Sequence, residues 1–143
     1  MTLADLTQIM QIEKQVFSNF WSEVFFIETI EKDICYVNRL DRELIGYLVG
    51  KKFNKVFYLM NFAIKKELHH QGYGMQMMRF LLSFLIKENF DFVFLDVRES
   101  NKAASNLYKH FGFAPYRKKL NYYSSPVEDA VQMLLNFNWF KKL

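Results

Sequence analysis

The sequence has little cysteine, glycine or proline and no long apolar run, and these scarcities exclude several classes of protein. The single cysteine, Cys35, excludes an internal disulfide framework and suggests a reducing compartment. Glycine occurs five times and proline twice, and no repeated or low-complexity segment is visible. The apolar runs fall far short of the ~20 residues that span a bilayer, and the first residues show no secretory signal pattern. We therefore expect a cytoplasmic protein without a membrane partner.

Apolar side chains are abundant in this sequence. Hydrophobic residues make up 51% of the 143 residues and aromatic residues 18%, which is enough to bury a substantial core. The length suits one domain, so a single domain over residues 1–143 is expected. The formal net charge of +4 suits a polyanionic cofactor or a ribosome-associated substrate. Because no dense run of Lys and Arg is present, we expect no direct DNA binding.

Hydrophobic periodicity and turn residues predict helices and strands in an α+β domain. Helices are expected at 2–17, 22–32, 72–88 and 101–111. Strands are expected at 33–40, 43–53, 55–64, 91–97, 113–123 and 128–138. The first three strands are joined as hairpins, and the apolar run at 91–97 is typical of a strand buried on both faces. One strand–helix–strand crossover is expected to be parallel and right-handed.

Two of the five glycines lie close together where a strand gives way to a helix, in the stretch "HHQGYGMQMM". The start of a helix presents unpaired N–H groups and a partial positive charge, so an anion such as a phosphate can bind there. Gly72 and Gly74 would let a phosphate approach these amides closely. The alternative is a tight turn that needs positive φ and holds no ligand.

Longer motifs around this stretch resemble those of the GNAT acetyltransferases. The segments are "NFAIKKELHHQGYGMQMMRFLL", "FLDVRESNKAASNLYKHFGF" and "KLNYYSSPVEDAVQM", and more narrowly they look like the RimI-type ribosomal-protein alanine N-acetyltransferases. The resemblance implies a GNAT fold, with a mixed, mainly antiparallel sheet of six to seven strands, about four helices and a splay at the cofactor site. It also implies acetyl-CoA as cosubstrate.

The resemblance assigns cofactor-binding residues to two segments of the chain. Main-chain groups of Phe62, Ala63 and Ile64 would line the pantetheine arm, and Asn101 would contact the cofactor further along. A set of consecutive residues would wrap the pyrophosphate: His70, Gln71, Gly72, Tyr73, Gly74 and Met75. His69 stands where the family usually has Gln or Arg. For residues 62–64 the alternative is ordinary strand pairing.

The resemblance also places two catalytic residues. Asp96 occupies the position at which RimI-type enzymes have a glutamate that accepts the proton of the amine. The alternatives are that Asp96 pairs with Arg98, or that Glu99 or a bound water acts as the base. Tyr108 matches the family's proton donor to the departing thiolate, although it also suits a half-buried helix tyrosine.

The acceptor groove would be formed by aromatic residues from two further segments. Tyr122 and Tyr123 match a segment that helps to form the peptide groove, and Trp21, next to Ser22, belongs to a loop facing it. Strand-edge aromatics and a helix cap are the alternative interpretation. The histidines have no partners at ligand spacing, so we expect no metal site.

Three hypotheses for function follow from these residues. The leading one is acetyl-CoA-dependent acetylation of the N-terminal α-amino group of an alanine-starting small-subunit ribosomal protein, with association with the ribosome. The second is acetylation of a small-molecule amine. The third is a catalytically silent module that binds acetyl-CoA, and it is favoured by Asp96 and His69, which depart from the family pattern.

Overall fold

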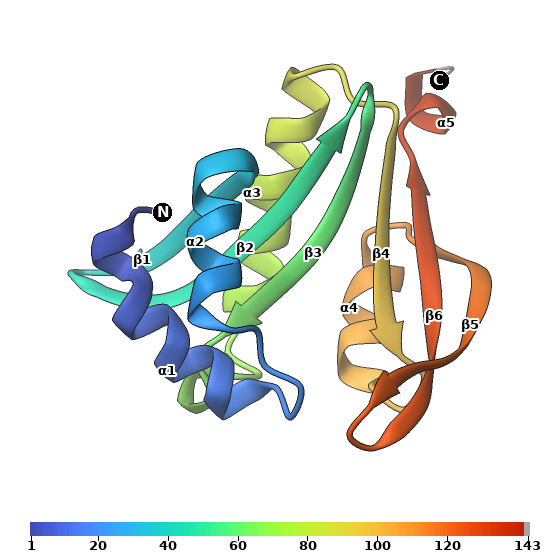
Figure 1. The fold of residues 1–143 in the computed structure, drawn as a ribbon. Helices are drawn as coiled ribbons and strands as arrows, with labels where there is room; N and C mark the ends of the chain where they lie inside the picture. The colour runs from blue at the N-terminus through green and yellow to red at the C-terminus, as the bar shows by residue number, and fades with distance from the viewer. Residues whose placement is uncertain (142–143) are drawn as a thin grey trace. The chain divides into compact units, whose positions relative to one another are not determined.

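The structure is a computed structural model, and it describes residues 1–141. Its helices, labelled in Figure 1, are α1 (Leu6–Val16), α2 (Glu23–Lys32), α3 (Tyr73–Lys87), α4 (Lys102–His110) and α5 (Asn138–Lys141). The strands are β1 (Ile34–Leu40), β2 (Glu43–Phe53), β3 (Val56–Ile64), β4 (Phe92–Arg98), β5 (Ala114–Ser124) and β6 (Val127–Asn136). No helix within this part of the chain is long and apolar enough to cross a membrane.

The predicted order of helices and strands is confirmed, with differences near the two ends of the chain. A short 3₁₀ turn, Leu3–Asp5, precedes α1, and the main-chain N–H of Thr2 donates to Asp5 Oδ2 over 2.8 Å. The last strand begins at Val127 and ends at Asn136, so the prediction of strand through residue 138 is wrong. Asn136 Oδ1 accepts the N–H of Asn138, and this bond turns the chain into α5.

The strands form a six-stranded sheet in the order β1-β2-β3-β4-β6-β5, within the predicted range of six to seven. β3 and β4 are parallel, whereas the β1–β2, β4–β6 and β5–β6 pairs are antiparallel. The parallel register runs from Val56–Phe92 to Leu59–Leu95, so it covers only the first four residues of each strand.

The chain divides into two compact units. Unit 1 comprises Met1–Lys51 and Met60–Arg79, and unit 2 comprises Lys52–Leu59 and the chain from Phe80 onward. The division falls within β2, within β3 and within α3, so each of these elements begins in one unit and ends in the other.

Unit 1 packs α1 and α2 against its strands, as Figure 1 shows. The apolar stripe of α1 places Ile9 and Ile12 in a core that also holds Phe26 of α2 and Tyr47 of β2. Ser22 caps α2 by accepting the N–H of Phe25 over 3.2 Å, as the sequence predicts. This core fixes the segment between the two helices.

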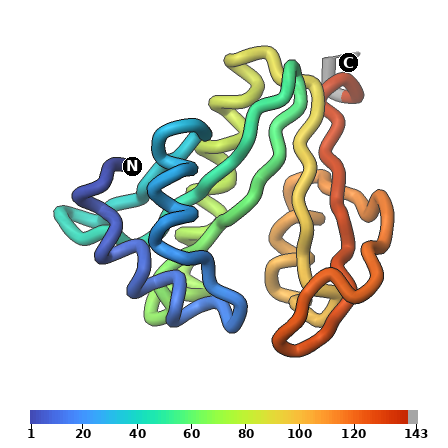
Figure 2. The backbone as a smooth tube through the Cα atoms, viewed as in Figure 1, coloured from blue at the N-terminus to red at the C-terminus, as the bar shows by residue number. Residues whose placement is uncertain are grey.

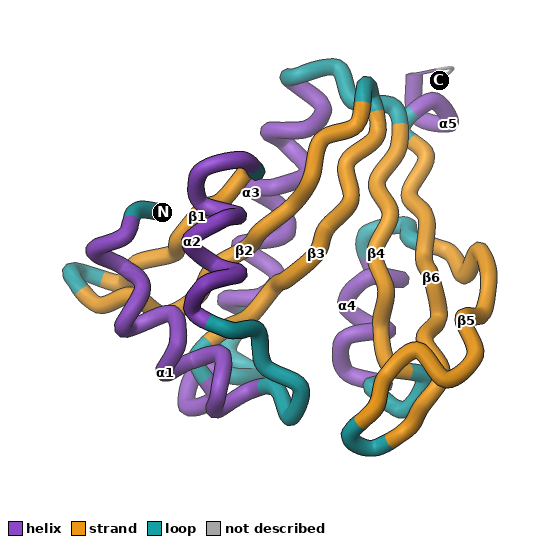
Figure 3. Tube along the Cα trace, viewed as in Figure 1, coloured by secondary structure: helices purple, strands orange, loops and turns teal. Residues whose placement is uncertain are grey.

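Unit 2 is built on β4, β6 and β5, with α4 partly behind β4 in Figures 2 and 3. The prediction that β4 is buried on both faces is only half right. Val93, Leu95 and Val97 are buried on one face, whereas Phe92 and Phe94 on the other face are half-buried. This second face carries the polar groups of the candidate site, which explains why apolar packing does not fill it.

Candidate active site

Asp96 lies near the end of β4, between strands β3 and β6 of the sheet. Because side chains alternate along a strand, Asp96 shares a face with Phe94. Its side chain is nevertheless only 6% exposed. A carboxylate this deeply buried needs hydrogen-bond partners, since burying an unpaired charge is very costly.

Two other strands of unit 2 supply these partners. Asp96 Oδ2 accepts hydrogen bonds from the Tyr58 hydroxyl of β3 and from Lys119 Nζ of β5, which lies 3.0 Å away. Lys119 Nζ also donates to the Tyr58 hydroxyl over 3.1 Å. The other carboxylate oxygen, Oδ1, is buried and has no hydrogen-bond partner among residues 1–141. One oxygen of the carboxylate is therefore buried with its hydrogen-bonding capacity unsatisfied.

Three phenols near this carboxylate are held in their protonated form. Burial, followed by the hydrogen bond to Asp96, raises the pKa of Tyr58. Burial and then the charge of Asp96 raise the pKa of Tyr122 and of Tyr123. All three side chains thus remain neutral hydrogen-bond donors at neutral pH.

Tyr122 and Tyr123 follow an irregularity in β5. The register with β6 shifts between Lys119 and Tyr123, and Asn121 adopts a φ of 50°. The Tyr122 ring lies 5.0 Å from Lys119 Nζ, whereas the Tyr123 ring lies 4.3 Å from the Arg98 guanidinium. Lys119 thus contacts both Asp96 and Tyr122. Tyr123 lies close enough for the charge of Asp96 to raise its pKa, so both predicted aromatics lie near Asp96.

The alternative partners and bases that the sequence offered lie in other ion pairs. Arg98 Nη1 pairs with Glu128 at 3.1 Å. Glu99 is exposed and pairs with Lys118 Nζ at 2.7 Å. The ion pair that buries Asp96 is instead the one with Lys119.

Tyr108 and Asn101 lie at opposite ends of α4. Tyr108 is buried, with its ring centroid 5.8 Å from that of Phe113, and burial raises the pKa of its phenol to about 12. Asn101 Oδ1 accepts the N–H of Ala104 over 3.1 Å, so Asn101 caps the helix.

The end of β3 in unit 1 holds the segment predicted to line a pantetheine arm. Ile64 O already contacts the Nε2 atom of His69 at 2.7 Å, so this nitrogen must carry the proton and donate. A Cβ built on Gly46 would lie 2.7 Å from Ala63 O. Glycine at position 46 therefore lets β2 approach the end of β3 closely. Apart from Ile64 O, the main-chain groups of Phe62, Ala63 and Ile64 remain the candidates for a ligand.

The glycine stretch forms the turn into α3. Gly72 has a φ of +89° and His70 a φ of 61°, both in the left-handed region. A Cβ on Gly72 would meet no atom within 4 Å, so open space lies in front of this residue. The first turn of α3 leaves N–H groups without partners inside the helix, and the bond from Gln76 N to Gly72 O, at 3.0 Å, begins the regular pattern. The turn therefore needs the positive φ that glycine adopts readily, and the space in front of Gly72 leaves room for a ligand.

Trp21 is held by a buried network that sequence reasoning missed. Glu13 of α1 is 1% exposed and accepts the N–H of Trp21 over 3.0 Å. The same carboxylate accepts hydrogen bonds from the Tyr47 hydroxyl and, over 2.9 Å, from Asn61 Nδ2. The clue in the sequence was a glutamate on the apolar stripe of α1, one position after Ile12.

Comparison with known proteins assigns this chain to a family. The family model described as "Acetyltransferase (GNAT) family" matches residues 6–113. This chain belongs to the GNAT acetyltransferase family. It is therefore an N-acetyltransferase, as the resemblance of the motifs predicts.

Individual relatives of this GNAT acetyltransferase match over nearly its whole length. A Bacillus subtilis protein, provisionally named a ribosomal protein bS18 alanine N-acetyltransferase, is 31% identical and is aligned over 96% of this chain and 93% of its own. An N-alpha-acetyltransferase of Sulfurisphaera tokodaii is 27% identical, over 92% and 87% of the two chains. The crystal structure of the ribosomal-protein-S18-alanine N-acetyltransferase from Escherichia coli superposes with a TM-score of 0.89 at 27% identity, covering 95% of this chain and 90% of the other.

Two residues of the candidate site, Tyr58 and Lys119, carried no recognisable signal in the sequence. Tyr58 lies in an apolar run, and Lys119 lies in "RKK", where three adjacent cations have the same local appearance. Their contacts with Asp96 depend on pairing between strands that are far apart in the chain. Only the fold brings them together.

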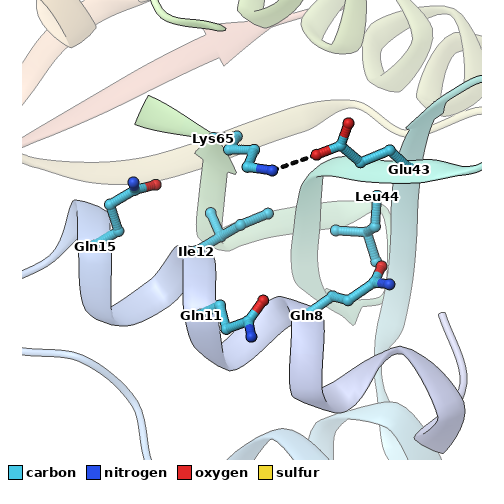
Figure 4. A pocket seen from close by; sticks show the side chains of 7 residues that line it. All are labelled: Gln8, Gln11, Ile12, Gln15, Glu43, Leu44 and Lys65. Atoms are coloured by element: carbon cyan, nitrogen blue, oxygen red, sulfur yellow. Dashed lines mark hydrogen bonds and ion pairs between the residues drawn. The ribbon is translucent and has the colours of Figure 1, made fainter. Parts of the chain in front are cut away.

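A shallow pocket of about 280 Å³ lies elsewhere on unit 1, as Figure 4 shows. Ile12 and Leu44 form part of its wall, next to the ion pair between Lys65 and Glu43. None of the residues predicted for the active site lines this pocket. In the described part of the chain, no group of three or more His, Cys, Asp or Glu side chains could hold a metal ion.

Proposed function

We propose that this acetyltransferase moves the acetyl group of acetyl-CoA to the N-terminal α-amino group of a protein in the cytoplasm. The acceptor we propose is an alanine-starting ribosomal protein of the small subunit. The observation that carries the proposal is Asp96, a buried carboxylate with one unpaired oxygen on the strand where the family places its proton acceptor. Such an oxygen is suited to accept a hydrogen bond or a proton from an amine.

Acetyl-CoA supplies the thioester, whose carbon–sulfur bond breaks as the amine nitrogen bonds to the acetyl carbon. Asp96 accepts the proton that this nitrogen loses. The Tyr108 hydroxyl donates a hydrogen bond to the departing sulfur. With a pKa of about 12 this phenol is a weaker acid than a thiol of pKa near 8.5, so it stabilises the thiolate and solvent provides the final proton.

The residues of unit 1 that we assign to the cofactor fit a diphosphate. Gly72 leaves open space in front of the turn, and α3 begins directly behind it. Backbone N–H groups at such a position bind anions together with the positive end of the helix dipole. We assign the diphosphate to His70–Met75, the pantetheine arm to main-chain groups at Phe62–Ile64, and a further contact to Asn101.

The acceptor assignment rests on the aromatic residues of β5 and on the relatives. Tyr122 is 51% exposed, and it lies near Asp96. Partial burial, and next to it the charge of Asp96, raise the pKa of the Tyr122 phenol. We assign Tyr122, Tyr123 and the Trp21 loop to the acceptor peptide. Relatives whose names specify alanine of bS18 favour a ribosomal protein, whereas others are named only as N-alpha-acetyltransferases.

The direct test uses purified protein, acetyl-CoA and a peptide copied from the N-terminus of the small-subunit protein. We expect CoA release together with a mass gain of one acetyl group at the α-amine. The same peptide with a blocked N-terminus should stay unmodified even if it contains lysine. Transfer only to polyamines or amino sugars in a parallel panel would contradict the peptide assignment.

A further inference from the structure

Lys119 makes contacts that the proposed reaction does not by itself require. Its Nζ atom lies 3.0 Å from Asp96 Oδ2 and 3.1 Å from the Tyr58 hydroxyl. The side chain is 22% exposed, and the rings of Tyr58 and Tyr122 lie 5.6 Å and 5.0 Å from Nζ. A cation thus occupies one side of the carboxylate that we assign as proton acceptor.

This cation addresses a problem that a lone carboxylate would create. The acceptor must be neutral to attack, yet a protein α-amino group has a pKa near 8, so only about a tenth is neutral at pH 7. An unpaired carboxylate beside the bound amine would favour the protonated ammonium still further. Asp96 alone would therefore hold its substrate in the unreactive form.

We propose that Lys119 is a positioning residue that offsets the charge of Asp96, so that the acceptor binds at Oδ1 as a neutral amine. This inference rests on the proposed function. Lys119 and Tyr58 both contact Oδ2, and they leave Oδ1 as the acceptor. Because like charges disfavour each other, the ammonium of Lys119 opposes binding of a second cation there.

A carboxylate paired with lysine is still able to complete the reaction. Once the neutral amine has bonded to the acetyl carbon, its nitrogen carries a positive charge and becomes a strong acid. Asp96 then needs little basicity to accept one proton through Oδ1. Nitrogen loses that proton and the sulfur leaves with the electron pair of its bond to carbon, so atoms and charge balance.

The other groups around this cluster do not change charge between pH 6 and pH 9. Arg117, whose charge opposes the raised pKa of Tyr58, donates through Nε to Gln132 at 2.9 Å, and Arg98 is paired with Glu128. Arginine stays protonated throughout this range. The phenols facing the cluster have raised pKa values for the reasons given above, and they are Tyr58, Tyr122 and Tyr123. A titration of the rate in this window therefore reports the acceptor amine.

The sequence offers a matched control in the adjacent lysine. Lys118 is 49% exposed and pairs with Glu99 at 2.7 Å and with Asp129 at 3.8 Å. Lys118 carries the same charge and lies on the same strand as Lys119, but its side chain points to the opposite face of the sheet. Lys118→Met removes an equal charge from the protein without touching Asp96.

The first experiment measures kcat with saturating alanine-starting peptide from pH 6 to pH 9.5. In Lys119→Met, we expect the acid limb of the pH–rate profile to move about one pH unit upward, because the bound amine stays protonated to a higher pH. The value of kcat should then fall roughly tenfold at pH 6.5 and recover near pH 9.5. Lys119→Arg should restore the wild-type midpoint, and Lys118→Met should keep it. A midpoint that is the same in all variants, or a loss of equal size at every pH, would overturn the role of Lys119.

A second experiment does not depend on turnover. Peptide binding is measured by calorimetry at pH 7 in two buffers with different ionisation heats. The wild type should release nearly one proton per bound peptide and Lys119→Met far less, because about nine tenths of the free amine is protonated. Binding without proton release by the wild type would overturn the inference while leaving the proposed function intact. Neither binding nor product formation with the wild type would overturn the proposed function itself, and this inference with it.

Discussion

At the scale of single residues, the two oxygens of Asp96 have different surroundings. Oδ2 receives the Tyr58 hydroxyl and the Lys119 ammonium, whereas Oδ1 is buried without a partner among the described residues. The position of Asp96 followed from the motif, because "FLDVRESN" is contiguous. Its partners could not be predicted, since they lie 38 and 23 residues away along the chain.

Tyr108 provides a residue-scale prediction. Removing its hydroxyl in Tyr108→Phe should lower kcat by about 10- to 100-fold while leaving the fold intact, because the ring still packs against Phe113. The shape of the pH–rate profile below pH 10 should not change, since a phenol with a pKa of about 12 is fully protonated there. Steady-state kinetics of both proteins measure this.

Tyr116→Phe is the matched control for the loss of a phenol. Tyr116 is 60% exposed and contacts Phe94 through its ring, so its hydroxyl should be dispensable. If Tyr108→Phe turns over as fast as Tyr116→Phe, Tyr108 has no part in the departure of the sulfur.

At the scale of elements, the helices and strands were predictable because their signals are local. Thr2 and Asp5 mark the start of the first helical segment, Ser22 caps α2, and Asn101 caps α4. The end of β6 was harder to predict, because the turn depends on a single hydrogen bond from the N–H of Asn138 to Asn136 Oδ1. The burial of Glu13 within α1 was likewise not predicted, because its hydrogen-bond partners lie far away along the chain.

The turn into α3 gives the first element-scale prediction. Gly72→Ala places a methyl group in open space, so its cost in the free protein is the left-handed backbone alone, about 1 kcal/mol. We expect the KM for acetyl-CoA to rise at least tenfold because the methyl group occupies the space that we assign to a phosphate. Kinetics at saturating peptide test this.

Gly112→Ala separates backbone strain from loss of binding. Gly112 also has a left-handed φ, of 94°, but it follows α4 and has no assigned ligand. The variant should lose similar stability and keep the KM of the wild type. An equal rise in KM for both glycine variants would show that strain, rather than the diphosphate, explains the effect.

Glu13 gives the second element-scale prediction. Glu13→Ala removes the acceptor of three hydrogen bonds and leaves the Tyr47 hydroxyl, Asn61 Nδ2 and the Trp21 N–H without their partner. We expect the free energy of unfolding to fall by about 3 kcal/mol. Urea titration measures it, with the exposed Glu31→Ala of α2 as control, expected within about 0.5 kcal/mol of the wild type. A similarly small change for Glu13→Ala would mean that the network is not needed for stability.

At the scale of the whole molecule, the chain keeps the GNAT strand order while dividing into two compact units. The fold class could be predicted because the order of the elements and the family motifs agree over nearly the whole chain. The division within β2, β3 and α3 could not be predicted, since no break in composition and no linker marks it in the sequence.

Binding of acetyl-CoA should stabilise the folded chain by mass action. At a free concentration of about 100 times Kd, the free energy of unfolding should rise by roughly 2.7 kcal/mol, which raises Tm by several degrees. Thermal unfolding with CoA and with pantetheine, which lacks the diphosphate, distinguishes the contribution of the phosphates. Equal shifts for both ligands would contradict the role assigned to residues 70–75.

The most direct test of the central claim is kcat for acetylation of an alanine-starting peptide by the wild type and by Asp96→Asn. The amide keeps the size of the side chain but cannot accept a proton as a carboxylate does, so we predict a fall in kcat of at least about 100-fold. Glu99→Gln, which removes the alternative base, should turn over like the wild type. A wild-type rate for Asp96→Asn, together with a large loss for Glu99→Gln, would contradict the account.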